Sequence, residues 1–597
     1  MTTKDPKLGV PKLDVPQLQA GGGIAAGTTK AREIDALSPL LVKHLRAIHS
    51  ELETNYRLES MEGQIRWLAE EQQCSERDAE LLMDGSFPHF ADYFLSGSAN
   101  AVRAAQPVDE SYPLSNYFIS SSHNTYLTGN QLASDSSADA YKNVLLRGCR
   151  CVEIDVHDGS DSSSDEEDAI NSGAPKVKKE KKSRTGLSIR KRLEARFSKK
   201  EESHTQETTA TTSEHGVEPW RTTSARVEPR VYHGYTMTSD MPFRAVCATI
   251  RDYAFQVTKL PLIVSIEVHA NYEQQEIMVE LMNEYWQGML IGPLTDPSHD
   301  YNSIDLPTLK ELEGKILVKV KRAHTKPVVT DGQSATLQAP ASLQKTTSAE
   351  STISTDTESE ETGKKAKPKP KLIDTLSMLG VYFGGYHFKS LDAPEATIPT
   401  HIFSLSEKTL MEVHETNAAA LFHHNKHFFM RAYPKGLRIT SSNLKPAVFW
   451  SAGVQIVALN WQRWDGGMMQ NEAMFAGTGG WVLKPEGYRN ASYDQTPRTA
   501  IPHHNLDLSI EFLAGQDIPL PPEETDPSHL KPYVKVELHT ERHGELRSEP
   551  MTGDGRSSKG DLKVKTKTYR STDPDFGREV VEFRGIQGVT EELTFVR

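Results

Sequence analysis

The sequence predicts a parallel α/β sheet or barrel, with a helical module before it and a β-sandwich after it. Three observations support this fold class. Between residues 112 and 322, and again from Leu372 to Arg489, strand-like apolar runs alternate with helix-like segments, as in parallel sheets. Before this region, apolar residues recur at spacings of three and four. After it the chain is rich in strand-like runs, which is typical of a sandwich.

Composition narrows the class of protein. A chain of 597 residues is too long for one hydrophobic core, so we expect about three modules. No run of 18 apolar residues occurs, and residues 1–19 lack the apolar core of a signal peptide. The net charge of −13 argues against nucleic-acid binding. The four cysteines form no disulfide framework. We therefore expect a cytoplasmic protein with reduced thiols and no nucleic-acid partner.

The first ordered segment is predicted to be helical. Residues 1–34 are rich in Gly, Pro and Lys and are predicted to be disordered. A helical module follows over 35–105, because apolar residues there keep helical spacing: Leu37, Leu41, Leu45, Ile48 and Leu52. The module contains no D-x-[DN]-x-[DN]-G loop, so no calcium is assigned to it.

The α/β region alternates strands and helices in order. The predicted strands are Tyr117–Ile119, Cys151–Val156, Val231–Tyr232, Leu262–Val268 and Lys315–Val320. The predicted helices between them include Ala138–Leu146, Phe243–Ala254 and Gln274–Tyr285. In the final region, strands are predicted at Leu506–Leu513 and Tyr533–Leu538.

Two low-complexity segments, 160–229 and 323–371, interrupt this alternation and are predicted to be disordered. The first begins with an acidic, Ser-rich run at 161–168, which is a candidate kinase site. Its residues 176–200 then hold twelve Lys or Arg against two Glu. Two interpretations remain open for this basic part: an amphipathic helix on anionic lipid, or a solvated, phosphorylated tail.

Polar residues stand where several predicted strands end. The strand at Tyr117 runs into a polar tip that carries His123 and Asn124. A lone histidine is most often a satisfied core residue. Here four further segments repeat the pattern of a strand with a polar tip, which is how a barrel presents functional side chains at its mouth.

Carboxylates at two of these tips indicate a cation. Glu153 and Asp155 are two residues apart, so on a strand they share one face and repel each other unless a cation lies between them. The alternative is a solvent-facing strand edge. Glu267 ends a continuous apolar run, where we expect it to be buried. With Asn124 these residues form an oxygen-only donor set, which favours Ca²⁺ or Mg²⁺ over zinc.

Basic residues complete the pattern. His233 ends another strand. The candidate residues include two histidines but no Ser, His and Asp in the order of a nucleophilic triad, which points to acid–base chemistry. Lys319 and Lys321 share a face, as do Arg431 and Tyr433. Beside a bound cation, these groups favour a substrate with several phosphates over the alternative of a solvated edge.

These motifs resemble those of the eukaryotic phosphoinositide-specific phospholipases C, most closely delta-like fungal forms. They include Ser-Ser-Ser-His-Asn-Thr-Tyr, Gly-Cys-Arg-Cys-Val-Glu-Ile-Asp, Tyr-His-Gly-Tyr-Thr and Gln-Ile-Val-Ala-Leu-Asn-Trp. The resemblance covers roughly two thirds of the chain. It implies a split, distorted TIM barrel made of an X half (112–322) and a Y half (372–490), joined by the linker 323–371. It also implies an EF-hand-like helical module and, at 504–597, an incomplete C2-type β-sandwich.

The resemblance also implies an activity and a role for each candidate residue. The activity is Ca²⁺-dependent hydrolysis of phosphatidylinositol 4,5-bisphosphate through a cyclic phosphodiester, by a monomer acting at the inner face of membranes. His123 would stabilise charge on phosphorus, His233 would be the general acid, and Glu267 or Glu153 the base. The implied Ca²⁺ ligands are Asn124, Glu153, Asp155 and Glu267. The implied phosphate and ring ligands are Lys319, Lys321, Ser404, Arg431 and Tyr433. An apolar rim that enters the bilayer would contain Leu132, Met237 and Leu437.

Two other functions compete with this one. A catalytically dead scaffold of the same fold is disfavoured because both histidines and all four oxygen ligands are present. A glycerophosphodiesterase on a TIM barrel is disfavoured because the Lys319/Lys321 and Arg431/Tyr433 pairs indicate additional substrate phosphates.

Overall fold

The structure is a computed structural model. It describes residues 36–72, 79–99, 105–159, 226–293, 301–322, 372–490, 501, 503–521, 524–540, 552–553 and 562–597. The predicted disordered segment 1–34, the linker 323–371 and most of the insertion 160–229, with its candidate kinase site and basic helix, lie outside these residues.

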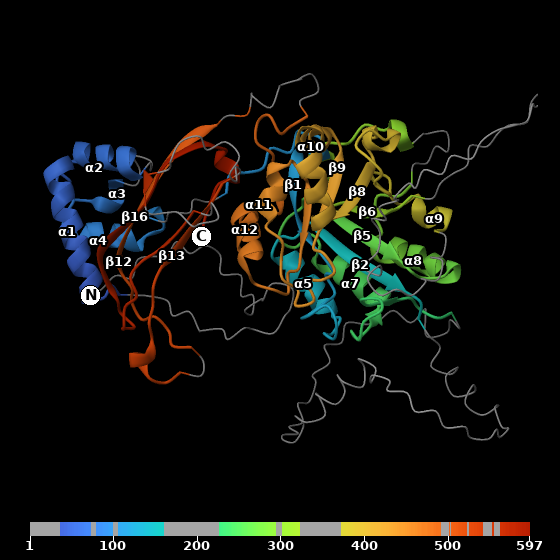
Figure 1. Cartoon of the computed structure of the whole chain (residues 1–597), viewed down its shortest axis with the longest axis horizontal. Coiled ribbons are helices and arrows are strands. Elements are labelled where there is room, and N and C mark those ends of the chain that lie inside the picture. The colour runs from blue at the N-terminus through green and yellow to red at the C-terminus, as the bar shows by residue number, and fades with distance from the viewer. Residues whose placement is uncertain are drawn as a thin grey trace, which may run out of the picture. The chain divides into compact units, whose positions relative to one another are not determined.

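The N-terminal described region is helical. Its elements are α1 (Pro39–Tyr56), α2 (Met61–Trp67) continued by a π-turn at Leu68–Gln72, α3 (Ala79–Leu82), α4 (Phe87–Leu95) and a 3₁₀ turn at Gly97–Ala99 (Figure 1). Ser38 caps α1 by accepting a hydrogen bond from the Leu41 amide at 3.3 Å. The helices enclose a small core that includes Trp67, Phe90 and Tyr93.

A closed parallel barrel forms the centre of the chain. Its strands are β1 (Tyr117–Ser122), β2 (Cys151–His157), β5 (Leu262–Val268), β6 (Ile316–Lys321), β7 (Phe383–Tyr386), β8 (His401–Ser406), β9 (Phe429–Tyr433) and β10 (Ile456–Leu459). They pair in the order β1-β10-β9-β8-β7-β6-β5-β2, and β2 returns to β1 through Ser121 and Cys151. The predicted TIM-barrel fold is therefore confirmed.

Short antiparallel strands extend this sheet. β11 (Trp481–Leu483) pairs with β1, and β3 (Arg230–Val231) pairs with β2 and with β4 (Met241–Pro242). The strand predicted at Val231–Tyr232 is thus β3, an antiparallel addition that lies outside the barrel. Its two residues are too few for a barrel strand, so His233 reaches the barrel from a hairpin beside β2.

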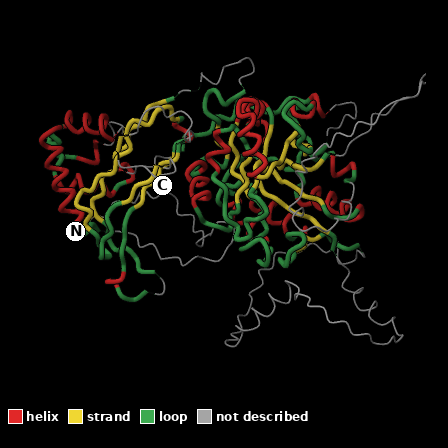
Figure 2. The backbone as a smooth tube through the Cα atoms, in the orientation of Figure 1, coloured by secondary structure: helices red, strands yellow, loops and turns green. Residues whose placement is uncertain are grey.

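Helices cover the outside of the barrel (Figure 2). They are α5 (Ala138–Leu146), α7 (Phe243–Tyr253), α8 (Tyr272–Tyr285), α9 (Asp374–Ser377), α10 (Glu407–His427), α11 (Pro446–Ser451) and α12 (Gly466–Phe475). Short 3₁₀ turns lie at Leu114–Asn116, Tyr301–Ser303, Lys310–Leu312 and Pro394–Thr397.

The barrel strands bury two separate apolar layers. Outward-facing residues such as Val152, Ile154 and Val156 pack in a core shared with the helices. Cys151 instead belongs to a second, inner cluster with Ile263 and others. Because side chains alternate along a strand, the residues that follow Cys151 on its own face are Glu153 and Asp155. On β2 the inner face is thus apolar at the start of the strand and acidic toward its end.

The C-terminal described region contains two antiparallel sheets. One has the order β12 (His504–Ala514), β16 (Asp575–Val589), β14 (Thr552–Gly553), and the other β15 (Leu562–Lys565), β13 (Lys535–His539), β17 (Phe595–Val596). Short 3₁₀ turns lie at Pro527–His529 and Glu591–Leu593. Val536, Leu538, Val581 and Phe583 contribute to the core between the sheets. Of the helices described along the chain, none has the length and apolarity needed to cross a bilayer.

Candidate active site

Strand register brings the predicted residues to one end of the barrel. Asp155 on β2 lies beside Glu267 on β5. Ser265, two residues before Glu267, lies beside Lys319 on β6. On the other side of the barrel, Ser404 of β8 lies beside Arg431 of β9. These positions all lie toward the carboxyl ends of the strands, the face where TIM-barrel active sites lie.

Asn124 is held at the turn after β1. Its φ of 43° is left-handed, a conformation that asparagine tolerates better than most residues. The turn directs its main-chain N–H to Oε2 of Glu153 at 3.0 Å. Its side-chain Nδ2 donates to Oε1 of Gln131 at 2.9 Å. The neighbouring His123 is buried and its Nδ1 lies 3.0 Å from Oδ1 of Asn460.

Glu153 is engaged on both carboxylate oxygens. Besides the Asn124 amide on Oε2, its Oε1 accepts a hydrogen bond from Nη2 of Arg431 at 2.6 Å. The two side chains are only 8% and 4% exposed, so solvent screens the pair little. Burial lowers the pKa of Arg431, but the charge of Glu153 and smaller contributions from other nearby groups together raise it above its ordinary value. Sequence reasoning placed Arg431 on a substrate phosphate and did not anticipate this ion pair.

Asp155 is a buried carboxylate whose charged form is disfavoured by its surroundings. Its Oδ2 accepts from the Tyr126 hydroxyl at 2.6 Å, whereas its buried Oδ1 has no hydrogen-bond partner among the described residues. Burial raises the pKa of Asp155 well above its ordinary value, and the charges of Glu267 and Glu153 raise it further. An unpartnered, buried carboxylate oxygen beside other carboxylates marks a place where a cation would be stabilised.

Glu267 differs from the expectation. It was expected to be buried at the end of an apolar run, but its side chain is 48% exposed and lies 3.1 Å from Nε2 of His269. The physical reason is that only the first five residues of β5 are buried, so the strand reaches the open mouth of the barrel before it ends.

The donor set fits a hard cation. No cluster of three or more His, Cys, Asp or Glu arranged for a metal occurs in the described ranges. Glu153 is already neutralised by Arg431. Asp155 and Glu267 lie side by side, however, and Oδ1 of Asp155, without a hydrogen-bond partner in the described ranges, is an oxygen that could ligate a cation. With the Asn124 amide they make an all-oxygen set of the kind that Ca²⁺ prefers.

His233 is buried after β3 and held by the main chain. Its Nδ1 lies 2.7 Å from the carbonyl oxygen of Gln131, which can only accept. Nδ1 therefore carries a proton, and this bond fixes the orientation of the ring. The Thr238 hydroxyl accepts the His233 amide at 3.2 Å and fixes the loop.

Polar groups line the other side of the mouth. Lys319 is partly buried and donates to the Ser265 hydroxyl at 3.2 Å, while Lys321 is exposed at the end of β6. The buried Oγ of Ser404 has no hydrogen-bond partner within the described part of the chain. The rings of Tyr433 and His123 are parallel, with centroids 6.1 Å apart. These groups thus face the mouth from β6, β8 and β9.

The three residues predicted to form an apolar rim are exposed. Leu132, Met237 and Leu437 are 45%, 49% and 64% exposed. Tyr235 and Ile439, which sequence reasoning missed, are also exposed. The loops are joined by main-chain bonds, for example from the Met237 amide to the Leu132 carbonyl at 2.9 Å. Tyr235 could have been found from its place between His233 and Met237.

A stack of three rings lies at the end of β2. His157, the last residue of β2, is stacked between Tyr232 at 4.1 Å and His269 at 4.4 Å. Burial lowers the pKa of His157 to about 3, and the nearby His269 adds to this effect. A Cβ at Gly234 would meet His157 Cε1 at 2.7 Å, so only glycine allows the His233 loop to pack this closely.

Gln131 and Asn460 are the main residues that sequence reasoning missed in the site. Both are buried and hydrogen-bonded to predicted site residues. Asn460 directly follows β10, as the predicted polar tips follow their strands, so its position offered a signal. Gln131 lies in a loop and offered none.

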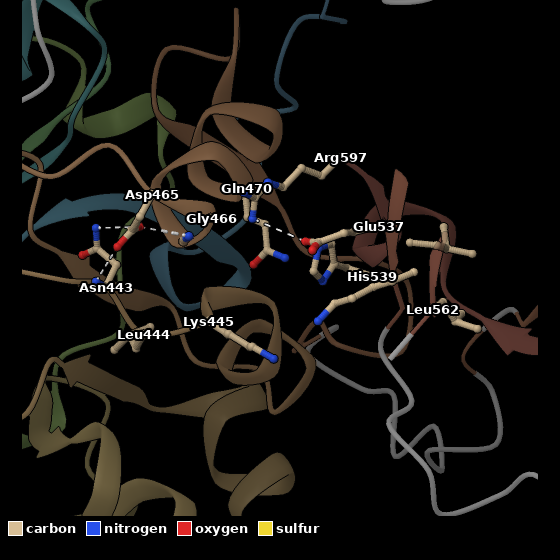
Figure 3. A pocket seen from close by; sticks show the side chains of 13 residues that line it. Asn443, Leu444, Lys445, Asp465, Gly466, Gln470, Glu537, His539, Leu562 and Arg597 are labelled. Carbon is tan, nitrogen blue, oxygen red and sulfur yellow. Dashed lines mark hydrogen bonds and ion pairs between the residues drawn. The ribbon is translucent and has the colours of Figure 1, made fainter. Parts of the chain in front are cut away.

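A pocket of about 290 Å³ lies outside the candidate active site (Figure 3). Barrel residues such as Lys445 and Gln470 line it together with Glu537, His539 and Arg597 of the C-terminal region. Arg597 Nη1 lies 3.4 Å from Oε2 of Glu537. None of the predicted site residues lines this pocket, so it is distinct from the candidate active site.

Comparisons with known proteins agree with the geometry. 1-Phosphatidylinositol 4,5-bisphosphate phosphodiesterase 1 of Candida albicans is 31% identical over 501 residues, covering 75% of this chain and 39% of that protein. The delta-3-A form of Danio rerio is 31% identical over 445 residues, covering 72% and 46%. The chain thus spans about half the length, or less, of these relatives. The crystal structure of S. officinalis PLC21 has a TM-score of 0.63 at 23% identity, covering 94% of this chain and 62% of that one, which supports the fold.

Family models give the clearest result. The X domain of phosphatidylinositol-specific phospholipase C matches residues 110–322, and the Y domain matches residues 376–487. Together the two matches span more than half of the chain and include both ends of the barrel sheet. The resemblance predicted from the motifs is confirmed. The chain belongs to the phosphatidylinositol-specific phospholipase C family.

Proposed function

We propose that this chain carries a Ca²⁺-dependent phospholipase C activity, which converts phosphatidylinositol 4,5-bisphosphate to diacylglycerol and inositol 1,4,5-trisphosphate. The observation that carries the proposal is Oδ1 of Asp155, which has no hydrogen-bond partner among the described residues and lies beside Glu267 at the mouth that also holds His123 and His233. The curated relatives are named for hydrolysis of this lipid, which supports the choice of substrate.

The reaction begins with the substrate's own nucleophile. The inositol 2-hydroxyl attacks the adjacent phosphorus, and the intramolecular geometry removes the need for a protein nucleophile. We assign the base to Glu267, because both oxygens of Glu153 are already bonded to Arg431 and the Asn124 amide. A bound Ca²⁺, held by Asn124, Asp155 and Glu267 with Glu153 beside them, would lower the pKa of the hydroxyl and offset charge on phosphorus.

The two histidines have different roles: His233 protonates the leaving group and His123 stabilises the negative charge that develops on the phosphate. Nδ1 of His233 donates to the Gln131 carbonyl, so Nε2 gives its proton to the departing diacylglycerol oxygen. His123 directs Nδ1 to Asn460, and a protonated ring offers its second N–H to a phosphate oxygen. Water then opens the cyclic phosphodiester, with His233 acting as the base for that step.

The remaining polar residues select the headgroup. We assign the 4- and 5-phosphates to Lys319, Lys321 and Tyr433. The Ser404 hydroxyl, which has no hydrogen-bond partner in the described part of the chain, would join them. Arg431 contributes through its charge and its free Nε, which has no partner within the described residues. The exposed rim of Leu132, Met237 and Leu437 would enter the bilayer, so we propose a monomer that binds peripherally at the inner face of membranes.

One assay tests the activity. Release of water-soluble inositol phosphate is measured from vesicles of phosphatidylcholine, phosphatidylserine and phosphatidylinositol 4,5-bisphosphate, with Ca²⁺ or with EGTA. The expected result is release that EGTA abolishes. Release that survives chelation would refute the Ca²⁺ assignment, and no release in either condition would refute the function.

The role of His233 needs a second substrate. His233→Ala is expected to lose activity on the lipid but to retain much more on an inositol phosphodiester with a very good leaving group, because that substrate needs no proton from the enzyme. Equal losses on both substrates would contradict the general-acid role.

A further inference from the structure

Gln131 has every polar atom of its side chain bonded inside the candidate site. The side chain is 5% exposed, although its neighbour Leu132 is 45% exposed on the rim. Its Oε1 accepts from Asn124 Nδ2 at 2.9 Å. Its Nε2 donates to Oδ1 of Asn460 at 3.1 Å and to the Ser441 hydroxyl at 3.0 Å. One amide thus joins residues of the X half to residues of the Y half.

The orientation of the Asn460 side-chain amide determines which atom donates in each of these bonds. Asn460 Nδ2 donates to the main-chain carbonyl of Ser442 at 3.2 Å, and a carbonyl can only accept. Oδ1 of Asn460 must therefore face the other way, where it accepts from both Gln131 Nε2 and His123 Nδ1. If the Asn460 amide were reversed, it would set N–H against N–H at Gln131.

The same logic continues to Asn124. Because Gln131 Nε2 must donate to Asn460, Gln131 Oε1 is the atom that faces Asn124. Asn124 must therefore donate to it through Nδ2, so that Oδ1 of Asn124 points away from Gln131. An amide that presents oxygen can ligate a cation, whereas an amide that presents NH₂ cannot.

We propose that Asn460 and Gln131 form a hydrogen-bond relay which sets the polarity of the site: it makes Asn124 present oxygen to the cation and makes His123 present Nε2 to the phosphate. Both relay residues are positioning residues, since neither touches the substrate in this assignment. The proposal rests on the proposed function for the identity of the cation and the phosphate.

The relay makes a prediction that a merely structural role does not make. In Gln131→Met, a side chain of similar length loses all three hydrogen bonds, and the Asn124 amide is free to rotate. Ca²⁺ affinity, measured by isothermal titration calorimetry without substrate, is expected to fall on the order of tenfold, as for other residues that orient metal ligands.

A double mutant tests the orientation itself. In Asn124→Asp the carboxylate presents oxygen whichever way it turns, and it can only face Gln131 Oε1 with another acceptor. Adding Gln131→Met to Asn124→Asp is therefore expected to leave Ca²⁺ affinity equal to or higher than that of Asn124→Asp alone. If Gln131→Met weakens Ca²⁺ binding equally in both backgrounds, the relay is wrong and Gln131 acts only through general packing.

Gln455 provides a matched control. It is also a fully buried glutamine, and it donates to the Asn425 and Phe428 carbonyls and accepts from the Met430 amide at the opposite end of the strands. Gln455→Met is expected to lower the melting temperature without changing Ca²⁺ affinity. A Ca²⁺ loss like that of Gln131→Met would overturn the relay.

The outcome separates the relay from the proposed function. If the wild-type chain binds Ca²⁺ but hydrolyses no phosphoinositide, the proposed function fails, and a selective loss of Ca²⁺ affinity in Gln131→Met still supports the relay. If the wild-type chain hydrolyses the lipid and Gln131→Met binds Ca²⁺ normally, the relay fails alone. A wild-type chain that binds no Ca²⁺ overturns both.

Discussion

Replacing Arg431 by Met should strongly destabilise the barrel, because it would leave Glu153 charged and buried. The two side chains are 4% and 8% exposed and share a hydrogen bond of 2.6 Å. Breaking such a pair by removing one partner costs about 3–5 kcal/mol, much of it the cost of the orphaned charge. Asp155 and Glu267 lie close to the same carboxylate, which adds repulsion once the guanidinium is gone.

The double mutant defines the reason for this loss. Glu153→Gln together with Arg431→Met removes both charges, so it should recover most of the stability that Arg431→Met loses. The free energy of unfolding is measured by urea denaturation in EGTA for the wild type, both single variants and the double variant. A loss of less than about 1 kcal/mol in Arg431→Met, or a double variant that is simply the sum of the singles, would refute a buried ion pair.

Three further outcomes are expected. Burial lowers the pKa of His424 to about 4, so below about pH 6.5 the unfolded chain takes up a proton before the folded chain does. The free energy of unfolding should therefore decline from pH 6.5 toward pH 4. His424→Phe should show a shallower decline when urea midpoints are measured over this range. Burial also lowers the pKa of Lys484 well below its ordinary value. As the pH falls below about 10.4, the pKa of a lysine in the unfolded chain, the unfolded chain takes up a proton first and the folded chain loses stability. The gain in stability of Lys484→Met over the wild type should therefore widen from pH 10 to pH 7. Leu132→Ser and Met237→Ser should weaken partitioning onto anionic vesicles several-fold without affecting a soluble substrate; unchanged vesicle binding would exclude the rim.

Much of the fold could be predicted from sequence because local patterns carry it. The helix at Ala138–Leu146 and the strand at Leu262–Val268 were predicted with the bounds that the structure has. Alternation along β2 correctly placed Val152, Ile154 and Val156 opposite Glu153 and Asp155, since side-chain direction on a strand depends only on counting by two. The roles assigned to the site residues stay predictions.

The sequence by itself determined which chemical groups stand at the strand ends, because a polar residue that follows an apolar run is visible in one dimension. Only the tertiary structure decided how those groups are paired. Arg431 and Glu153 are 278 residues apart and meet through strand order. Glu267 is exposed because β5 reaches the open mouth of the barrel. Gln131, in a loop without any pattern, contacts Asn124, Asn460 and His233, since hydrogen-bond partners are set by barrel closure and not by spacing along the chain.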